Sequence, residues 1–427
     1  MLLFLRRLRR LDMTLSESGE RSFRRTDLGR VGNAAERIEI TTADASSPVR
    51  AEKFLVLRAA RTPPPTFKRS ATTLEVALLL DAAPRTFPVC AYLPLRDCGL
   101  RFVLQADWDV PAARNQVKED SAWNQWLREV AAVAVADAFQ IAREVEGGRD
   151  GELLRLLPPE ESSVEPWFRP LVVSLYKEMR GRACLRTSDG SAEPWVRPSQ
   201  ALHFPTTVAA AARAVLTPAD LEASQLSLLH PAVQDLLAAE DRLAARLKVR
   251  VLTQGLLLDV LEAAAHRGAL AERPAPWCAR ALLLLYAFVD DSSDTHARAL
   301  ERMRALPLLP LDGAGRACAK GHVFQRADSS AERYSFERAL PTVADALFEE
   351  VAPADRPVLS LFLSVHLRVP RREPKVLLGF LEAFLEKDVS VRDAVDVARW
   401  LLENEAALGA AADGVVIFLL SFIMNSG

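Results

Sequence analysis

The sequence has few cysteines and histidines, and they are too scattered to build a metal site or a disulfide framework. The five cysteines (Cys90, Cys98, Cys184, Cys278 and Cys318) form no Cys-x-x-Cys pair, and the six histidines are equally dispersed. Zinc sites and secreted disulfide scaffolds both need ligands or cysteines at short, regular spacing. The sequence therefore predicts neither, and it predicts a reducing intracellular location, in the cytoplasm or the nucleus.

The chain also lacks an excess of charge of either sign. Its 54 Lys and Arg against 56 Asp and Glu give 427 residues a net charge of −2. Bulk charge would therefore not recruit nucleic acid, and the arginine clusters lack the interleaved aromatic residues of a nucleic-acid-binding module. Half of the residues are hydrophobic, which is enough for two or three soluble domains with real cores.

Long apolar runs are missing as well. Residues 415–424 (VVIFLLSFIM) form a run of ten, too short to span a bilayer, so we expect a buried helix rather than a membrane anchor. The first eleven residues (MLLFLRRLRRL) place apolar residues before arginines, the reverse of a signal peptide. On their own they predict a short amphipathic helix at a membrane surface; the family resemblance described below implies a linking helix instead. Both ends are abrupt, and we expect a fragment or a truncated gene model.

The stretch Pro94–Leu127 contains the most specific pattern in the chain. Within it, Leu100–Ala106 (LRFVLQA) alternates apolar and polar residues over much of its length, which predicts a half-buried strand. Pro111 ends this strand because proline has no N–H to donate to a neighbouring strand. Ser121 can cap a helix that runs to about residue 144. The loop between strand and helix carries one arginine, Arg114, at its tip.

This stretch resembles the region that follows the ATPase module in the NO VEIN and sacsin-like protein family, relatives of the heat-shock-protein-90-like ATPases. The strings that carry the resemblance are AYLPLRDCGLRFVLQADWDVPAARNQV and SAWNQWL. The chain departs from the family pattern at Ala112 and Ala113, where the family has serines, and at Asn115, where it has glutamate. A weaker likeness extends over about two thirds of the chain. The retained residues are Leu93, Pro94, Leu95, Arg96, Gly99, Gln105, Asp107, Pro111, Arg114, Val117, Ser121, Trp123, Asn124, Trp126 and Leu127.

The resemblance also indicates what this chain is missing. The ATP site of these relatives needs an acidic residue and an asparagine on one helix, a D-x-G-x-G loop and a glycine-rich lid. The nearest string, residues 312–316 (DGAGR), has the wrong glycine offset and falls in a predicted hairpin turn, and no P-loop motif is present. We therefore expect no enzymatic activity and no ATP or magnesium binding by this chain alone. Both are implied only together with the family's upstream ATPase module.

The resemblance implies a role for Arg114. In related split ATPases the domain after the nucleotide site supplies a basic residue to the γ-phosphate, and arginine suits phosphate oxygens because it can bond two of them. The alternative is that Arg114 pairs with Glu119 or Asp120 and orders its own loop. Two tryptophans on the following helix are either core residues or a docking face for a partner. The residues expected to support the loop and helix are Asn115, Ser121, Trp123, Asn124 and Trp126.

A second cluster of charges points to different chemistry. Asp290, Asp291 and Asp294 follow an apolar helical run in the spacing D-D-x-x-D. Isoprenoid synthases bind magnesium and diphosphate through carboxylates one helical turn apart. The alternative is that one helix ends here and the next begins with a capping residue. No second acidic motif accompanies the first.

The sequence as a whole predicts an α+β chain. A mostly antiparallel sheet, covered by the long helix that starts near Ser121, is followed by a mainly helical region with two small β-hairpins at Asp189-Gly190 and Asp312-Gly313. The predicted divisions are a partly disordered linker or helix (1–35), the sheet domain (36–150), a helical region with both hairpins (151–330) and a helical, truncated end (331–427).

The function predicted from these patterns is non-catalytic. We expect a coupling and interaction portion of a chaperone-like ATPase of the NO VEIN and sacsin-like type, with the upstream ATPase module and unidentified client proteins as partners. One alternative is an interaction scaffold with no nucleotide role. A distant alternative is a magnesium-dependent isoprenoid-diphosphate enzyme.

Overall fold

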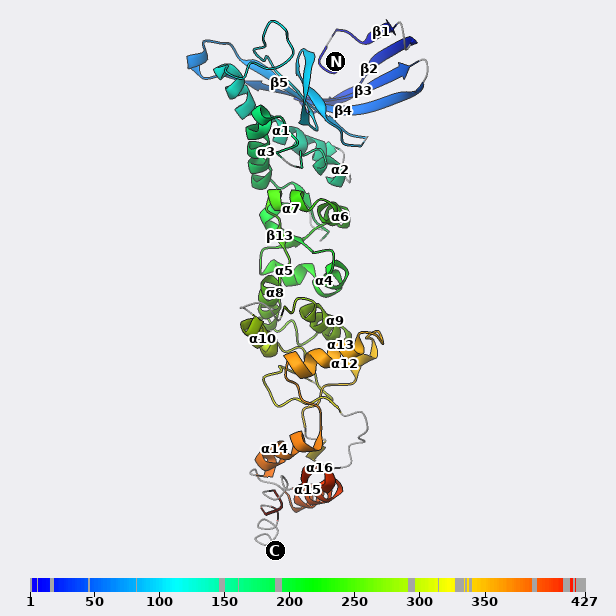
Figure 1. Cartoon of the computed structure of the whole chain (residues 1–427), viewed down its shortest axis with the longest axis vertical. Helices are drawn as coiled ribbons and strands as arrows, with labels where there is room; N and C mark the ends of the chain where they lie inside the picture. Colours follow the sequence, from blue (N-terminus) through cyan, green and yellow to red (C-terminus); the bar gives the residue numbers. More distant parts are fainter. Residues whose placement is uncertain are drawn as a thin grey trace. The chain divides into compact units, whose positions relative to one another are not determined.

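The structure is a computed structural model (Figure 1). It describes every residue except 1, 6, 16–18, 45–46, 82, 146–149, 160, 189–193, 291–295, 314, 327–333, 335, 338–339, 386–389, 410–414, 418 and 420–427. The chain divides into two compact units. The first comprises Met1–His203 and Leu226–Val251, and the second comprises Phe204–Gln225 and Leu252–Gly427. The domain boundaries predicted from the sequence stay predictions.

An eight-stranded sheet dominates the first unit (Figure 1). Its strand order is β1-β2-β3-β4-β5-β8-β6-β7, and every pairing is antiparallel except that of β6 with β8. This confirms the mostly antiparallel sheet. The strands are β1 (Arg10–Leu15), β2 (Gly19–Val31), β3 (Ala35–Asp44), β4 (Ser47–Arg61), β5 (Thr72–Leu79), β6 (Phe87–Ala91), β7 (Leu93–Leu100) and β8 (Val103–Gln105).

Strands β1 and β2 correct the expectation of a linker or helix over residues 1–35. The sequence there is polar, but its charged side chains are matched across neighbouring strands. Arg21 lies 2.6 Å from Asp44 of β3, and Arg25 lies 2.8 Å from Glu36 of β3. Leu2, Leu3 and Phe4 are buried in a turn against the sheet rather than in a surface helix. A hydrophobicity pattern misses such strands because their stabilising contacts are cross-strand ion pairs.

The first unit buries apolar residues on both faces of the central strands. Alternate residues of β4 point to opposite faces, so Leu55 and Leu57 join one core while Phe54 and Val56 join another. Helix α1 (Ala122–Val145) packs on β4 and β5 and covers the first of these faces, as the sequence predicted. The turn at Leu2–Phe4 covers part of the second face.

Short elements complete the first unit. The predicted hairpin is present as β9 (Leu185–Arg186) paired with β10 (Trp195–Val196), although its Asp189-Gly190 turn lies outside the described residues. A small parallel sheet, β12-β11-β13, was not predicted because strands of two or three residues carry no detectable period. The remaining elements are η1 (Pro65–Phe67), α2 (Asp150–Leu154), η2 (Pro166–Phe168), α3 (Arg169–Gly181), η3 (Pro198–Gln200), β11 (Ala201–His203), β12 (Ser227–Leu228), α6 (Pro231–Ala239), α7 (Asp241–Leu247) and β13 (Arg250–Val251).

The second unit is mainly helical and contains the second predicted hairpin, β14 (Leu309–Pro310) with β15 (Arg316–Ala317). Asp312 and Gly313 lie in the turn between its two strands, where the sequence predicted a hairpin turn. The helices are α4 (Ala209–Val215), α5 (Pro218–Glu222), α8 (Gln254–His266), α9 (Ala275–Tyr286), α10 (His296–Ala305), α12 (Ala346–Glu349), α13 (Arg356–Leu361), a π-turn η4 (Phe362–His366), α14 (Pro374–Leu385), α15 (Val391–Glu403) and α16 (Glu405–Leu408).

No helix in the described part of the chain has both the length and the apolar character needed to cross a membrane. All five cysteines are free. Burial raises the pKa of Cys184 to about 12 and the pKa values of Cys90, Cys98 and Cys278 to about 11, so these four thiols stay protonated near neutral pH.

Candidate functional site

The loop between β8 and α1 is held in place by side chains at the start of α1. Asn124 is 0 % exposed, and its Oδ1 accepts the Asp109 N–H at 2.8 Å. Its Nδ2 donates to the carbonyls of Asp109 and Lys118 at 2.8 and 2.9 Å. Ser121 Oγ donates to Asp109 Oδ2 at 2.7 Å and accepts the Asn124 N–H at 3.3 Å. One buried amide therefore ties both ends of the loop together.

The tryptophans of α1 lie mostly in the core. Trp123 is 3 % exposed and donates its indole N–H to the Asp107 carbonyl at 2.7 Å. Its ring packs against Trp126 and Phe67, with centroids 4.9 and 5.7 Å away. Trp126 is half-buried. The guanidinium of Arg69 lies 4.5 Å from the Trp123 ring centroid, so it covers one face of this ring.

Arg114 lies exposed at the tip of the braced loop, with a left-handed backbone (φ 49°). Its Nη2 donates to the Ala91 carbonyl at 3.0 Å. It makes no ion pair with Glu119 or Asp120, which corrects the alternative considered from the sequence; Glu119 instead lies 3.9 Å from Arg96. Asn115 is also exposed and makes no side-chain hydrogen bond with a described residue.

A second side chain holds the same peptide group that Arg114 contacts. Gln105 Oε1 accepts the Tyr92 N–H at 2.6 Å, while Arg114 donates to the oxygen of the same Ala91–Tyr92 peptide. Tyr92 has φ 64° and is 59 % exposed. A left-handed conformation costs an ordinary L-residue about 1–2 kcal/mol. The two clamping side chains therefore fix a strained, exposed aromatic residue at the turn between β6 and β7.

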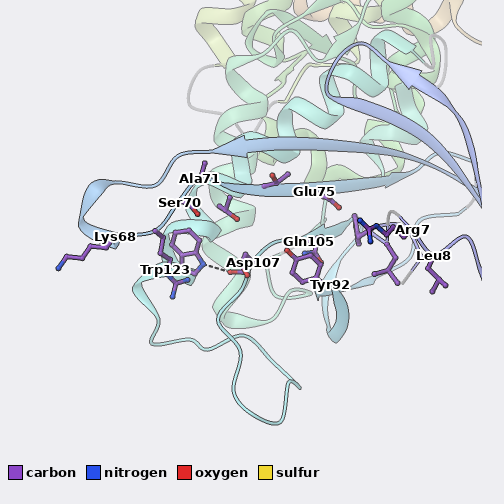
Figure 2. A pocket seen from close by; sticks show the side chains of 15 residues that line it. Arg7, Leu8, Lys68, Ser70, Ala71, Glu75, Tyr92, Gln105, Asp107 and Trp123 are labelled. Carbon is purple, nitrogen blue, oxygen red and sulfur yellow. Dashed lines mark hydrogen bonds between the residues drawn. The ribbon is translucent and has the colours of Figure 1, made fainter.

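Tyr92 stands at a cleft of about 1170 Å³ (Figure 2). Small-molecule pockets typically enclose about 300–1000 Å³, so this cleft is larger than most. Its walls come from segments far apart in the sequence, and they are rich in charge. Figure 2 shows these side chains around the cleft, with the hydrogen bond between Trp123 and Asp107. The charged lining residues are Arg7, Lys68, Arg69, Glu75 and Asp107.

Glu75 of this cleft belongs to a row of charged residues that crosses four strands. Arg25 bonds Glu36 at 2.8 Å, Arg58 bonds the same Glu36 oxygen at 2.5 Å, and Arg58 reaches Glu75 at 3.0 Å. Burial alone would raise the pKa of Glu36, but the hydrogen bond and charge of Arg58, together with the charge of Arg25, hold it below its ordinary value. Arg25 also donates to the carbonyls of Leu2 and Leu3, at 3.3 and 2.8 Å, and so anchors the N-terminal turn.

Comparison with known proteins gives one partial relationship. Over 121 residues, 27% of its length, the chain is 33% identical to Protein NO VEIN of Arabidopsis thaliana. This chain is similar to part of NO VEIN. The matched part amounts to 4% of that protein's length, so the chain spans a small fraction of its relative. No protein-family model and no solved structure match the chain. The link to sacsin and to heat-shock-protein-90-like ATPases stays a prediction.

The NO VEIN-like stretch was the part of the site that the sequence could locate. Arg114, Ser121 and Asn124 were expected from the sequence, and the structure brings all three to one loop. Tyr92 and Lys68 were not expected. The available signal for Tyr92 was the retained Gln105, a polar residue in a strand whose neighbours are buried.

The alternative metal cluster finds no support in the described residues. Helix α9 ends at Tyr286, so Asp290 lies in the following coil and not on the helix. Asp291 and Asp294 lie outside the described residues. Within the described ranges, no group of three His, Cys, Asp or Glu side chains is placed to hold a metal ion.

Proposed function

We propose that this chain is the non-catalytic coupling and interaction portion of a NO VEIN-like protein. In this proposal it acts beside an ATPase module of the heat-shock-protein-90-like type and assists a chaperone-like cycle. Arg114 contacts the γ-phosphate of the ATP bound by that module. The proposal rests on the resemblance of Pro94–Leu127 and on the geometry of Arg114.

The observation that carries the proposal is the presentation of Arg114. The residue is exposed, its loop is braced by the buried Asn124, and its guanidinium has no carboxylate partner among the described residues. One guanidinium N–H is used on the Ala91 carbonyl. An unneutralised cation on a fixed loop is suited to phosphate, because the loop needs little reordering when the phosphate arrives.

A second function, an interaction scaffold without a nucleotide role, is favoured by a different observation. The cleft beside Tyr92 is large, charged and built on a rigid sheet. Such a cleft can bind a partner whether or not Arg114 contacts a nucleotide. The loss or survival of ATPase stimulation in the Arg114 variant separates the two functions experimentally.

The test measures ATP hydrolysis by a separately produced ATPase module of a NO VEIN-like protein, with and without this chain. We expect the chain alone to be inactive and the mixture to be stimulated. Arg114→Ala should reduce the stimulated rate of ATP hydrolysis tenfold or more. Arginines that contact a transferring phosphoryl group have effects at least this large. Arg24→Ala, at an exposed cation on β2, is the matched control. Stimulation that survives Arg114→Ala would contradict the phosphate contact.

A further inference from the structure

Backbone strain is concentrated at the cleft. Six described residues other than glycine have a left-handed backbone, and three of them belong to this region: Lys68 (φ 51°), Tyr92 (φ 64°) and Arg114 (φ 49°). Lys68 and Tyr92 line the cleft, and Arg114 bonds the peptide that carries Tyr92. None of the three is an asparagine, aspartate or glycine, which tolerate this conformation best. Strain of this kind persists where the surrounding structure imposes it, and it clusters at functional sites.

Two exposed hydrophobic residues, Tyr92 and Leu93, follow each other at the turn between β6 and β7. Tyr92 is followed by Leu93, which is 46 % exposed, so an aromatic ring and a leucine stand together on the surface at the turn between β6 and β7. Tyrosine is one of the residue types that contribute most to protein–protein affinity. Gln105 and Arg114 immobilise the Tyr92 backbone before any partner arrives, so less entropy is lost on binding.

Charge indicates the chemistry of the partner. Arg7, Lys68 and Arg114 have no carboxylate partner among the described residues, whereas Arg69 is paired with Asp109 at 3.1 Å. Two carboxylates line the cleft. Glu75 is paired with Arg58, whereas Asp107 has no cationic partner among the residues that the structure describes. Among the lining residues, two unneutralised cations, Arg7 and Lys68, face one unneutralised acid, Asp107, and Arg114 adds a third cation beside Tyr92. The charge around Tyr92 is therefore positive in excess. Carboxylates of a partner would neutralise it.

We propose that this cleft binds an extended acidic segment of a partner protein, with Tyr92 as its aromatic contact and Arg7 and Lys68 as its lining cations, supported by Arg114 next to Tyr92. The inference specifies the partner of the interaction scaffold proposed above and rests on that function, and it requires no nucleotide. A peptide fits better than a small molecule because the cleft is large and open to solvent. It fits better than single-stranded nucleic acid, which needs several exposed rings for stacking, because Trp123 is covered by Arg69.

The test uses the full chain and three fluorescein-labelled peptides of about 12 residues with the same apolar content, a length that suits an extended segment in a groove. One peptide is rich in Glu and Asp, one in Lys and Arg, and one in Ser and Gln. A labelled oligothymidine of similar length is the fourth probe. Fluorescence anisotropy gives the affinity of each. We expect the acidic peptide to bind most tightly, with an affinity that falls as salt is added.

Tyr92→Gly is the decisive variant. Glycine adopts a positive φ without strain, so this change removes the ring while sparing the fold. We expect the affinity for the acidic peptide to fall about tenfold or more, the range of an interface hot spot. Lys248→Gly is the matched control, since Lys248 has φ 57° and does not line the cleft. It should leave binding unchanged.

Charge reversal supplies a second, independent readout. The double variant Arg7→Glu, Lys68→Glu should bind the acidic peptide more weakly. The control double variant Arg24→Glu, Arg30→Glu changes exposed cations of β2 outside the cleft and should keep the original affinity. The proposal is overturned by equal binding of neutral and acidic peptides, by absence of binding, by a preference for oligothymidine, or by indifference to Tyr92→Gly. The Tyr92→Gly variant retains Arg114. If it loses peptide binding but still stimulates the ATPase module, peptide binding and the phosphate contact are separate functions.

Discussion

Arg114 and Gln105 hold opposite ends of one peptide group, the oxygen of Ala91 and the N–H of Tyr92. The two side chains come from the loop after β8 and from β8 itself, and both belong to the NO VEIN-like stretch. Arg114 therefore already has a structural task, which is to position Tyr92. A phosphate that drew the guanidinium away from Ala91 would release one side of this clamp.

The buried amide of Asn124 should be essential to the loop that carries Arg114. Asn124→Ala removes one acceptor and two donor contacts. It leaves the Asp109 N–H without a partner, whereas the Asp109 and Lys118 carbonyls each keep one backbone N–H, from Lys118 and Ser121. We expect a loss of about 2–4 kcal/mol in the free energy of unfolding, measured by urea denaturation. Asn115→Ala, at an exposed neighbour, should change it by less than about 0.5 kcal/mol. Equal effects of the two changes would contradict the bracing role.

Tyr92 should be more stable as glycine than as alanine. Both substitutions delete the ring, but alanine keeps the steric penalty of the left-handed backbone (φ 64°). We expect the free energy of unfolding of the Tyr92→Gly variant to be about 1 kcal/mol higher than that of the Tyr92→Ala variant. The same pair of changes at Lys248 should give a similar difference. A more stable alanine variant would mean that Tyr92 is not strained.

Glu36 should make stability depend on pH in the acid range. Its pKa in the folded chain lies below the ordinary value of 4.5, because the effects of Arg58 and Arg25 exceed that of burial. The unfolded chain therefore binds more protons near pH 4.5, and this contribution is present above that pH and is lost as the pH falls through the folded pKa. We expect the advantage of the natural chain over Glu36→Gln, measured by urea midpoints, to shrink as the pH falls below 4.5. A constant advantage from pH 6 to pH 3 would refute this assignment.

Gly99 should tolerate no side chain. A Cβ atom there would lie 2.1 Å from the Ser163 carbonyl oxygen, and its φ is +79°. Gly99→Ala should therefore cost about 3 kcal/mol or more, through the clash and the backbone penalty together. Gly32→Ala supplies the comparison, since Gly32 also has a positive φ (+58°) but no atom within 4 Å of a Cβ. The difference in unfolding free energy between the two variants measures the clash; no difference would contradict the close approach.

Elements with a strong local signal were predicted well. Helix α1 carries a clear apolar period, and the strands of both hairpins formed beside Asp-Gly pairs. Leu100–Ala106, which was predicted as one strand, instead contains the end of β7, a bend at residues 101–102 and the short β8. Strands β1 and β2 were missed because their order comes from ion pairs such as Arg21–Asp44, which join residues far apart in the chain. Thr342 and Val343, just before the short helix α12 (Ala346–Glu349), form β-bridges with Phe324 and Leu311, contacts that a local pattern does not predict.

The sequence alone determined that a sheet is followed by helices, and that Arg114 lies in a loop before a helix with two tryptophans. Both follow from short-range interactions: the period of apolar side chains, helix capping and turn-forming residues. Only the tertiary structure decided what Arg114 touches. Its partner is the Ala91 carbonyl rather than the neighbouring Glu119 or Asp120. The sign of φ at Tyr92 and the cleft beside it were likewise decided by hydrogen bonds and packing between segments that only folding brings together. A local pattern carries no information about such contacts, because their energy depends on residues distant in the sequence.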